Sequence, residues 1–307
     1  MNSKLLLADK KPISQLLVLL AFVFVSVALF AILSLVASVF LFDINIMSPN
    51  GLTDYTNPNV IAALKFMQFW QALGLFVFPP IAWAFLVSKN RMEVLGLKQT
   101  PNLIYVALVA LLVIFGQPLI NFFAEVNQSL VLPEFMSGIE LWMKQSEEQA
   151  AIITKAFLKM DGAFDLSLNI LIIALLPAIG EELLFRGALQ PLLIKTAKNK
   201  HLGIWLGAIL FSAMHMQFYG FLPRMLLGAA FGYIYFWSGN LWFPIFGHFI
   251  NNGSAVVMAY LIGIEKLDES AETIGANSAV MVLVSAFVSS VVMWFFFKNR
   301  RKESIIA

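Results

Sequence analysis

The sequence contains no cysteine and little charge. The absence of cysteine excludes disulfides, thiolate zinc sites and thiol catalysis. Only 12% of the 307 residues are charged, against about 25% in a soluble domain, while 60% are hydrophobic and the mean hydropathy is +0.83. A formal net charge of +2 gives no basis for a nucleic-acid partner. This composition predicts an all-α, polytopic membrane protein embedded in a lipid bilayer.

Apolar runs of roughly 20 residues predict about eight transmembrane helices. The runs cover about 16–42, 66–88, 103–123, 171–194, 203–219, 225–237, 241–262 and 277–297. The sixth run is short and contains Gly228 and Gly232, so it is the least typical of the eight. The first run is too long for a cleaved signal peptide and is interpreted as a retained span. No internal repeat or heptad pattern accompanies these runs.

Basic residues alternate with acidic residues from loop to loop. The basic segments contain Lys4, Lys10 and Lys11; Lys89, Arg91 and Lys98; Lys195, Lys198 and Lys200; and Lys298, Arg300, Arg301 and Lys302. The loops between them are neutral or acidic. Because Lys and Arg concentrate on the cytoplasmic side, both termini are predicted to be cytoplasmic. The third loop, about 125–162, mixes apolar and charged residues and predicts an amphipathic helix on the membrane surface.

A charged cluster interrupts the fourth apolar run. Glu181, Glu182 and Arg186 lie within six residues of one another. A carboxylate at bilayer depth costs at least ~2.5–3.5 kcal/mol, so these groups must be paired, neutralised or hydrated, and they mark a functional site. Glu182 and Arg186 are four residues apart and can form an ion pair on one helical face. Glu181 is turned about 100° away and is free for another role.

Two of the three histidines also lie in apolar runs. His201 is in a basic loop and is interpreted as a solvated surface residue. His215 ends the motif Phe211-x-x-x-His215, and His248 begins the motif His248-x-x-x-Asn252. A structural hydrogen bond explains one buried histidine at least as well as catalysis does. The argument for a site therefore depends on whether these residues converge.

Helical rise places the three motifs at similar depth. At ~1.5 Å per residue, Glu181 is about 21 Å from the cytoplasmic end of its helix and His215 about 22 Å from the end of its own. Asn252 is about 18 Å from the start of its helix at Asn240. A carboxylate, two imidazoles and an amide can activate water and stabilise an oxyanion on a carbonyl. We therefore predict an intramembrane polar cavity that hydrolyses an amide bond.

The three motifs, in this order and spacing, resemble the signature of the CPBP family of intramembrane proteases. This family is also called the Abi or CAAX-protease family and includes the type II CAAX prenyl endopeptidases. The resemblance covers roughly residues 165–262. It implies a helical bundle in which residues 163–297 form the protease core, after N-terminal spans in 1–162 and before a basic cytoplasmic tail in 298–307.

The resemblance also implies roles for the individual residues. Glu181 with His215 would activate the water, and His248 with Asn252 would form the oxyanion hole. Glu182 and Arg186 would be a supporting structural pair. No metal is favoured, because Glu181 cannot be both a ligand and a free base and no HExxH motif is present. The zinc alternative, with Glu181, His215 and His248 as ligands, stays open.

The expected substrate is a peptide or protein cut near its C-terminus or close to the membrane, by a protein of the bacterial cell membrane. Two other functions are alternatives. A non-catalytic immunity or scaffold protein would keep the signature and act by binding. A transporter would also line a cavity with charged residues, although the buried charges are confined to one half of the chain instead of a repeat interface.

Overall fold

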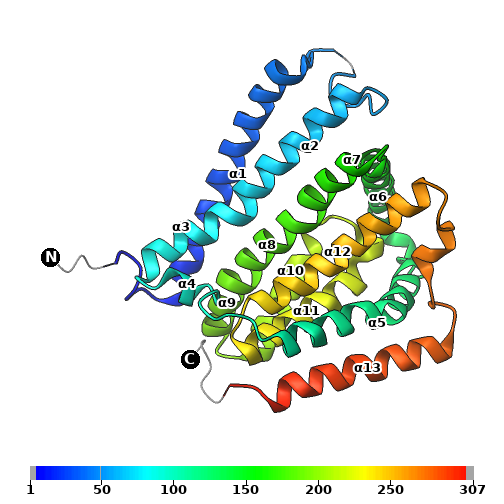
Figure 1. The fold of residues 1–307 in the computed structure, drawn as a ribbon. Coiled ribbons are helices and arrows are strands. Elements are labelled where there is room, and N and C mark those ends of the chain that lie inside the picture. Colours follow the sequence, from blue (N-terminus) through cyan, green and yellow to red (C-terminus); the bar gives the residue numbers. More distant parts are fainter. Residues whose placement is uncertain (1–4, 49, 302–307) are drawn as a thin grey trace.

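The computed structural model describes residues 5–48 and 50–301, and within them every regular element is a helix. Figure 1 shows these helices arranged as one bundle with a hairpin of two long helices at one side. The α-helices are α1 (Pro12–Phe42), α2 (Pro58–Ala72), α3 (Phe78–Val87), α4 (Arg91–Val94), α5 (Leu103–Gln128), α6 (Ser137–Leu158), α7 (Ala163–Asn169), α8 (Leu176–Glu182), α9 (Gln190–Ala197), α10 (Lys200–Ala213), α11 (Phe221–Ser238), α12 (Trp242–Gly263) and α13 (Ala279–Lys298). The predicted all-α helical membrane bundle is confirmed. Lys4, Lys302 and the end of the predicted basic tail lie outside the described residues.

Six helical segments are long and apolar enough to cross a bilayer. They are Pro12–Phe42, Pro58–Val87, Leu103–Gln128, Ala163–Ala197, Trp242–Gly263 and Ala279–Lys298. A helix also lies in each of the two remaining predicted runs, but α10 is shorter and α11 does not meet the same criterion. The location of the helices follows the sequence, whereas the number of eight spans stays a prediction.

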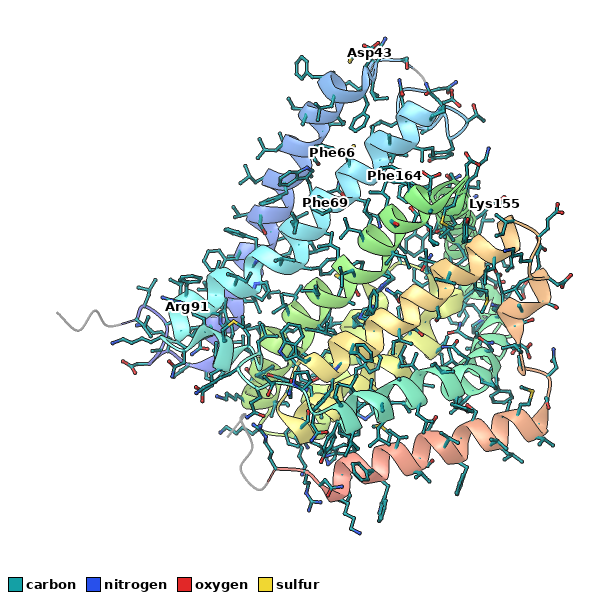
Figure 2. All side chains as sticks on the ribbon, in the orientation of Figure 1. Asp43, Phe66, Phe69, Arg91, Lys155 and Phe164 are labelled. Carbon is teal, nitrogen blue, oxygen red and sulfur yellow. The ribbon has the colours of Figure 1, made fainter. Side chains whose placement is uncertain are left out.

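In the hairpin formed by α1, α2 and α3, helix α1 presents many apolar side chains outward. On α1, Phe24, Val25 and Phe40 are 73%, 67% and 81% exposed. Figure 2 shows the side chains of α1 and of α13 projecting away from the bundle. Phe66 of α2, labelled in that view, packs its ring 5.6 Å from the ring of Phe42. Such outward apolar faces are those that lipid would cover, since lipid tails are as apolar as these side chains.

Three π-helical turns interrupt the long helices, and each one precedes a proline. They are Leu73–Val77 (η1), Ile170–Leu175 (η3) and Leu183–Leu189 (η4), and the prolines that follow are Pro79, Pro177 and Pro191. Proline cannot donate the i→i−4 hydrogen bond, and its ring clashes with the carbonyl four residues earlier. A wider turn just before the proline relieves that clash without ending the helix.

The turn η4 lies in the centre of the core, and all seven of its residues are buried. It packs against α3 and α10, while the neighbouring α8 packs against α12 and η1. On the far side, α5 and α13 cover α11 and α12. The acidic residues Glu181 and Glu182 end α8 at this central position, so the fold places the charged cluster in its interior.

The amphipathic segment predicted in 125–162 forms the helix α6. It follows a short 3₁₀ turn, Glu134–Met136 (η2), and exposes Ile139, Leu141 and Trp142. The Trp142 ring lies 5.1 Å from that of Phe218, in the 3₁₀ turn Phe218–Gly220 (η5) before α11. The helix is confirmed, and its location on the membrane surface stays a prediction.

Candidate active site

Glu182 and Arg186 form the ion pair that their spacing predicts. Arg186 Nη1 donates to Glu182 Oε1 at 2.8 Å, and both side chains are at most 3% exposed. Arg186 Nη2 donates to the Gly228 carbonyl at 3.0 Å, and the guanidinium lies 4.5 Å from the Phe211 ring centre. A buried ion pair is favourable only when further hydrogen bonds satisfy its polar atoms. These contacts therefore attach the acidic helix to α10 and α11.

Glu182 also binds His248, which the sequence did not predict. His248 Nδ1 lies 2.9 Å from Glu182 Oε1. Because the Glu182 carboxylate is paired with Arg186 and can only accept a hydrogen bond, we assign the proton to Nδ1 of His248. His215 Nδ1 lies 2.9 Å from the Phe211 carbonyl, which can only accept, so this ring is also protonated on Nδ1. Both imidazoles consequently present Nε2 to the space between them.

The Glu181 carboxylate lies between the two imidazoles. Glu181 Oε2 is 3.9 Å from Nε2 of His215 and 3.9 Å from Nε2 of His248. The residue is 6% exposed, and among the described residues this oxygen has no hydrogen-bond partner. A separation of 3.9 Å lets one water oxygen approach either pair of atoms at a hydrogen-bond length of about 2.8 Å. The three side chains thus surround a position suited to a water molecule.

Asn252 lies on the same cavity as the histidines. This cavity of about 80 Å³ is lined by Phe211, His215, Arg224, Leu227, Phe231, His248, Asn251 and Asn252. Asn252 Nδ2 donates to the Ile173 carbonyl at 3.3 Å, and its Oδ1 accepts from Asn251 at 3.1 Å. The amide has two N–H groups, so one is left to donate into the cavity. The structure therefore brings together all four side chains predicted to share one depth.

Two glycines of α11 let this helix approach the site closely. Gln190 Nε2 donates to the Gly232 carbonyl at 3.0 Å, one helical turn along from the Arg186 bond to Gly228. A Cβ atom at Gly232 would lie 2.7 Å from Gln190 Oε1. Small residues four apart are the usual means of close helix packing in membranes. The glycines that made this run atypical are therefore what joins it to the core.

Sequence reasoning missed Gln190 and Arg224. Gln190 is 2% exposed and packs between α9 and α11. Arg224 lines the cavity with the two histidines. The available signal for Arg224 was its charge in the apolar stretch between Phe221 and Gly228, one residue before the run predicted to begin at 225.

His201 lies away from the cavity, and the structure also bears on the zinc alternative. His201 is exposed and lies 2.7 Å from the Tyr233 hydroxyl, as expected of a surface residue. Among residues 5–48 and 50–301, no three His, Cys, Asp or Glu side chains are placed closely enough to hold a metal ion. The three side chains of the zinc alternative, Glu181, His215 and His248, are therefore farther apart here than zinc ligands would be.

Comparison with known proteins places this site in a defined segment. Residues 163–254 match the family described as type II CAAX prenyl endopeptidase Rce1-like. This segment begins with α7, ends inside α12 and contains every predicted site residue. The chain is also 34% identical over 86 residues to the uncharacterized protein YpbD of Bacillus subtilis (strain 168). That alignment covers 27% of this chain and 41% of YpbD.

No solved structure matches the chain. The match to the family coincides with the helices that carry Glu181, His215 and His248. The resemblance inferred from the three sequence motifs is confirmed: residues 163–254 match the model of the type II CAAX prenyl endopeptidase Rce1-like family.

Proposed function

We propose that the protein is an intramembrane endopeptidase that hydrolyses a peptide bond of a membrane-associated peptide or protein. The observation that carries this proposal is the buried Glu181 carboxylate, whose Oε2 has no hydrogen-bond partner among the described residues and lies 3.9 Å from the Nε2 atoms of both histidines. An unpartnered buried carboxylate is costly, and such groups persist where chemistry needs them. The Rce1-like match over the same residues supports a protease.

Glu181 and His215 activate the water in this proposal. With Nδ1 donating to the Phe211 carbonyl, neutral His215 presents an Nε2 lone pair that accepts a proton from water. Glu181 accepts a second hydrogen bond and orients the water toward the substrate carbonyl. General-base catalysis of this kind contributes about 10²–10⁴ in rate.

His248 and Asn252 stabilise the negative charge that develops on the carbonyl oxygen. Asn252 donates its remaining N–H group. His248 Nδ1–H is committed to Glu182, so its Nε2 can donate only when the ring carries a second proton. The adjacent carboxylates of Glu181 and Glu182 stabilise that imidazolium. The pair Glu182–Arg186 therefore positions His248 as well as the acidic helix.

The zinc alternative uses the same three side chains differently. Glu181, His215 and His248 would hold the ion, since each histidine already donates Nδ1–H to a carboxylate or carbonyl, as metal-bound histidines do. Zinc supplies a Lewis acid that lowers the pKa of a bound water to about 7. Ligand atoms in a tetrahedral zinc site are only about 3.3 Å apart, so the side chains would move closer than the observed 3.9 Å.

The decisive experiment compares wild type and Glu181→Gln on a pool of short synthetic peptides. The substitution is nearly isosteric, so we expect normal yield and a loss of cleavage of about 10²–10⁴. A matched Glu148→Gln variant, changed in exposed α6, should cleave normally. Cleavage by Glu181→Gln at the wild-type rate would show that this carboxylate takes no part in activating the water. Binding of peptides without cleavage by wild type would favour the immunity or scaffold alternative.

Dialysis against a strong chelator separates the two mechanisms. The metal-free mechanism predicts unchanged activity and substoichiometric zinc in the purified protein. Stoichiometric zinc that is lost together with activity, and is absent from His215→Ala and His248→Ala, would establish the zinc mechanism. Metal content by elemental analysis gives the result independently of any substrate.

The cellular setting is a proposal drawn from the loops. The six apolar segments make the protein an integral membrane protein. The basic loops support a cytoplasmic location for both termini, and the shortness of these loops supports a bacterial cell membrane.

A further inference from the structure

A second arginine reaches the catalytic cavity, and it differs from Arg186 in its partners. Arg224 of α11 lines the cavity of about 80 Å³ together with His215, His248 and Asn252. It is partly buried, and its guanidinium donates only to Gln217, at 2.8 Å to Oε1 and 3.4 Å to the carbonyl. The other donors of the guanidinium are left for another acceptor.

No carboxylate of the described residues forms an ion pair with this arginine. Their ion pairs within 4.0 Å include Arg186 with Glu182, and none includes Arg224. A cation inside a helical membrane protein normally pairs or faces a ligand pathway. Arg186 is the paired cation, since it binds Glu182. Arg224 is the cation that faces a ligand pathway, since it lines the proposed catalytic cavity.

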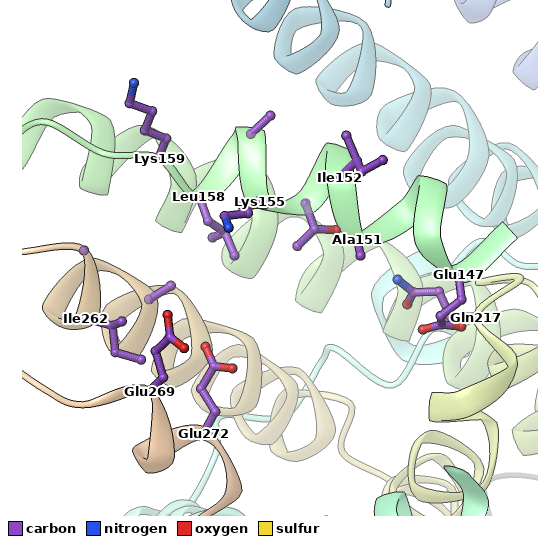
Figure 3. A pocket seen from close by; sticks show the side chains of 14 residues that line it. Glu147, Ala151, Ile152, Lys155, Leu158, Lys159, Gln217, Ile262, Glu269 and Glu272 are labelled. Carbon is purple, nitrogen blue, oxygen red and sulfur yellow. The ribbon is translucent and has the colours of Figure 1, made fainter. Parts of the chain in front are cut away.

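The partner of Arg224 connects the catalytic cavity with a larger one. Gln217 also lines a cavity of about 900 Å³ beneath α6, shown in Figure 3 with Gln217 beside Glu147 at one end. Its other walls come from the end of α12 and from Glu269 and Glu272 in the 3₁₀ turn Glu269–Thr273 (η6). This volume is that of a ligand site, whereas 80 Å³ holds water and not a peptide segment. Gln217 lines the larger cavity, and Arg224, to which it is hydrogen-bonded, lines the smaller one.

We propose that Arg224 binds a carboxylate of the peptide substrate, replacing Gln217 as its partner when the peptide passes from the larger cavity into the catalytic one. Arginine matches a carboxylate with two parallel N–H···O bonds, which fixes orientation as well as charge. The carboxylate is either the C-terminal one of the peptide or that of an Asp or Glu side chain. This inference rests on the proposed protease function and makes Arg224 a residue that determines specificity.

The test uses the purified full chain and one pool of short peptides in three forms. The forms carry a free C-terminal carboxylate, a C-terminal amide, or acidic side chains changed to their amides. Wild type should prefer the form that keeps the recognised carboxylate. If the C-terminal amide is cleaved less well, the recognised group is the C-terminal carboxylate; if the form with amidated side chains is cleaved less well, it is that of an Asp or Glu side chain. Arg224→Gln should raise KM for the preferred form about 10- to 100-fold with little change in kcat. The neutral form should be cleaved by this variant as by wild type.

Two further variants separate recognition from folding. Arg224→Lys keeps the charge without the planar fork and should recover only part of the preference. Arg91→Gln, a change at an exposed arginine that packs over the Phe85 ring, should leave the preference intact. Equal slowing of all three forms by Arg224→Gln would assign this residue a structural role and overturn the proposal.

A binding measurement keeps this inference distinct from the proposed function. Fluorescently labelled peptides are titrated into Glu181→Gln with and without Arg224→Gln, so no cleavage is needed. Tighter binding of the carboxylate form, lost in the double variant, supports carboxylate recognition even if wild type cleaves none of the peptides. Equal binding of carboxylate and neutral forms to Glu181→Gln would contradict it.

Discussion

Helix α1 of the hairpin and the core bury different kinds of polar group. In α1, the buried residues are Leu19 and three serines, Ser26, Ser34 and Ser38. In the core, Glu181, Glu182, Arg186 and His248 are buried together. The serine hydroxyls donate hydrogen bonds to backbone carbonyl oxygens three or four residues earlier in the same helix. The charged side chains of the core instead bind one another.

This difference shows which polar groups organise each region. A hydroxyl that bonds to its own helix costs little and permits close packing wherever it occurs. A carboxylate or guanidinium requires partners from separate helices, and here they come from η4, α11 and α12. Single substitutions of the α1 serines should therefore have small, independent effects on stability. In the core, a substitution of one charged residue also affects the residues that it binds.

Breaking the Glu182–Arg186 pair should have the largest effect on folding. Glu182→Ala leaves the Arg186 charge buried without its carboxylate and removes the hydrogen bond to His248. Arg186→Ala leaves the Glu182 carboxylate and the Gly228 carbonyl without their donor. Removing one partner of such a buried pair costs ~3–5 kcal/mol. Both variants should show a lower folded yield and a lower midpoint of denaturation, measured by size-exclusion chromatography and by titration with a denaturing detergent.

The chain offers a matched control on its surface. Glu140 and Lys144 of α6 have the same i,i+4 spacing at 2.6 Å, but Lys144 is 60% exposed. Alanine at either position should leave yield and midpoint almost unchanged, because exposed pairs are weak. If breaking the Glu140–Lys144 pair lowered the yield and midpoint as much as breaking the Glu182–Arg186 pair, burial would not explain the importance of the core pair.

Asn252→Ala should have the next largest effect, on rate and not on stability. Removing one oxyanion donor lowers kcat by roughly 10²–10³, with a smaller change in KM. Asn251→Ala should cost about tenfold or less, since Asn251 acts through Asn252: it accepts from Gln117 Nε2, donates to Asn252 Oδ1 and so holds that amide in place. Steady-state kinetics on a cleaved peptide measure both. A larger loss from Asn251 than from Asn252 would exchange their roles.

Much of this architecture could be predicted from the sequence because apolar run length and charge spacing report it directly. The helices, the Glu182–Arg186 pair and the convergence of the two histidines on Glu181 follow from 1.5 Å rise and i,i+4 geometry. The count of spans was less accessible, because α10 and α11 are short helices whose packing, not length, holds them in the bundle.

Contacts between distant segments could not be predicted in the same way. The bond from His248 to Glu182 joins residues 66 positions apart, and spacing within one helix carries no information about it. The π-helical turns before Pro79, Pro177 and Pro191 have a local cause, yet proline alone also permits a kink or a helix end. Arg224 was hidden because its charge marked the edge of an apolar run.

The smallest predicted effect comes from the hairpin and tests the comparison from its other side. The Ser26 hydroxyl lies within hydrogen-bond distance of the Gly74 carbonyl on η1 and of the Phe22 carbonyl in its own helix. The Ser34 hydroxyl contacts only the Ala31 carbonyl of its own helix, at 3.1 Å. Ser26→Ala should therefore cost ~0.6 kcal/mol, the usual value of a hydrogen bond between membrane helices, and Ser34→Ala less, both measured by detergent denaturation. A loss from Ser26→Ala as large as that from Arg186→Ala would show that the hairpin, too, is held by a network of polar contacts, and the contrast between the two regions would disappear.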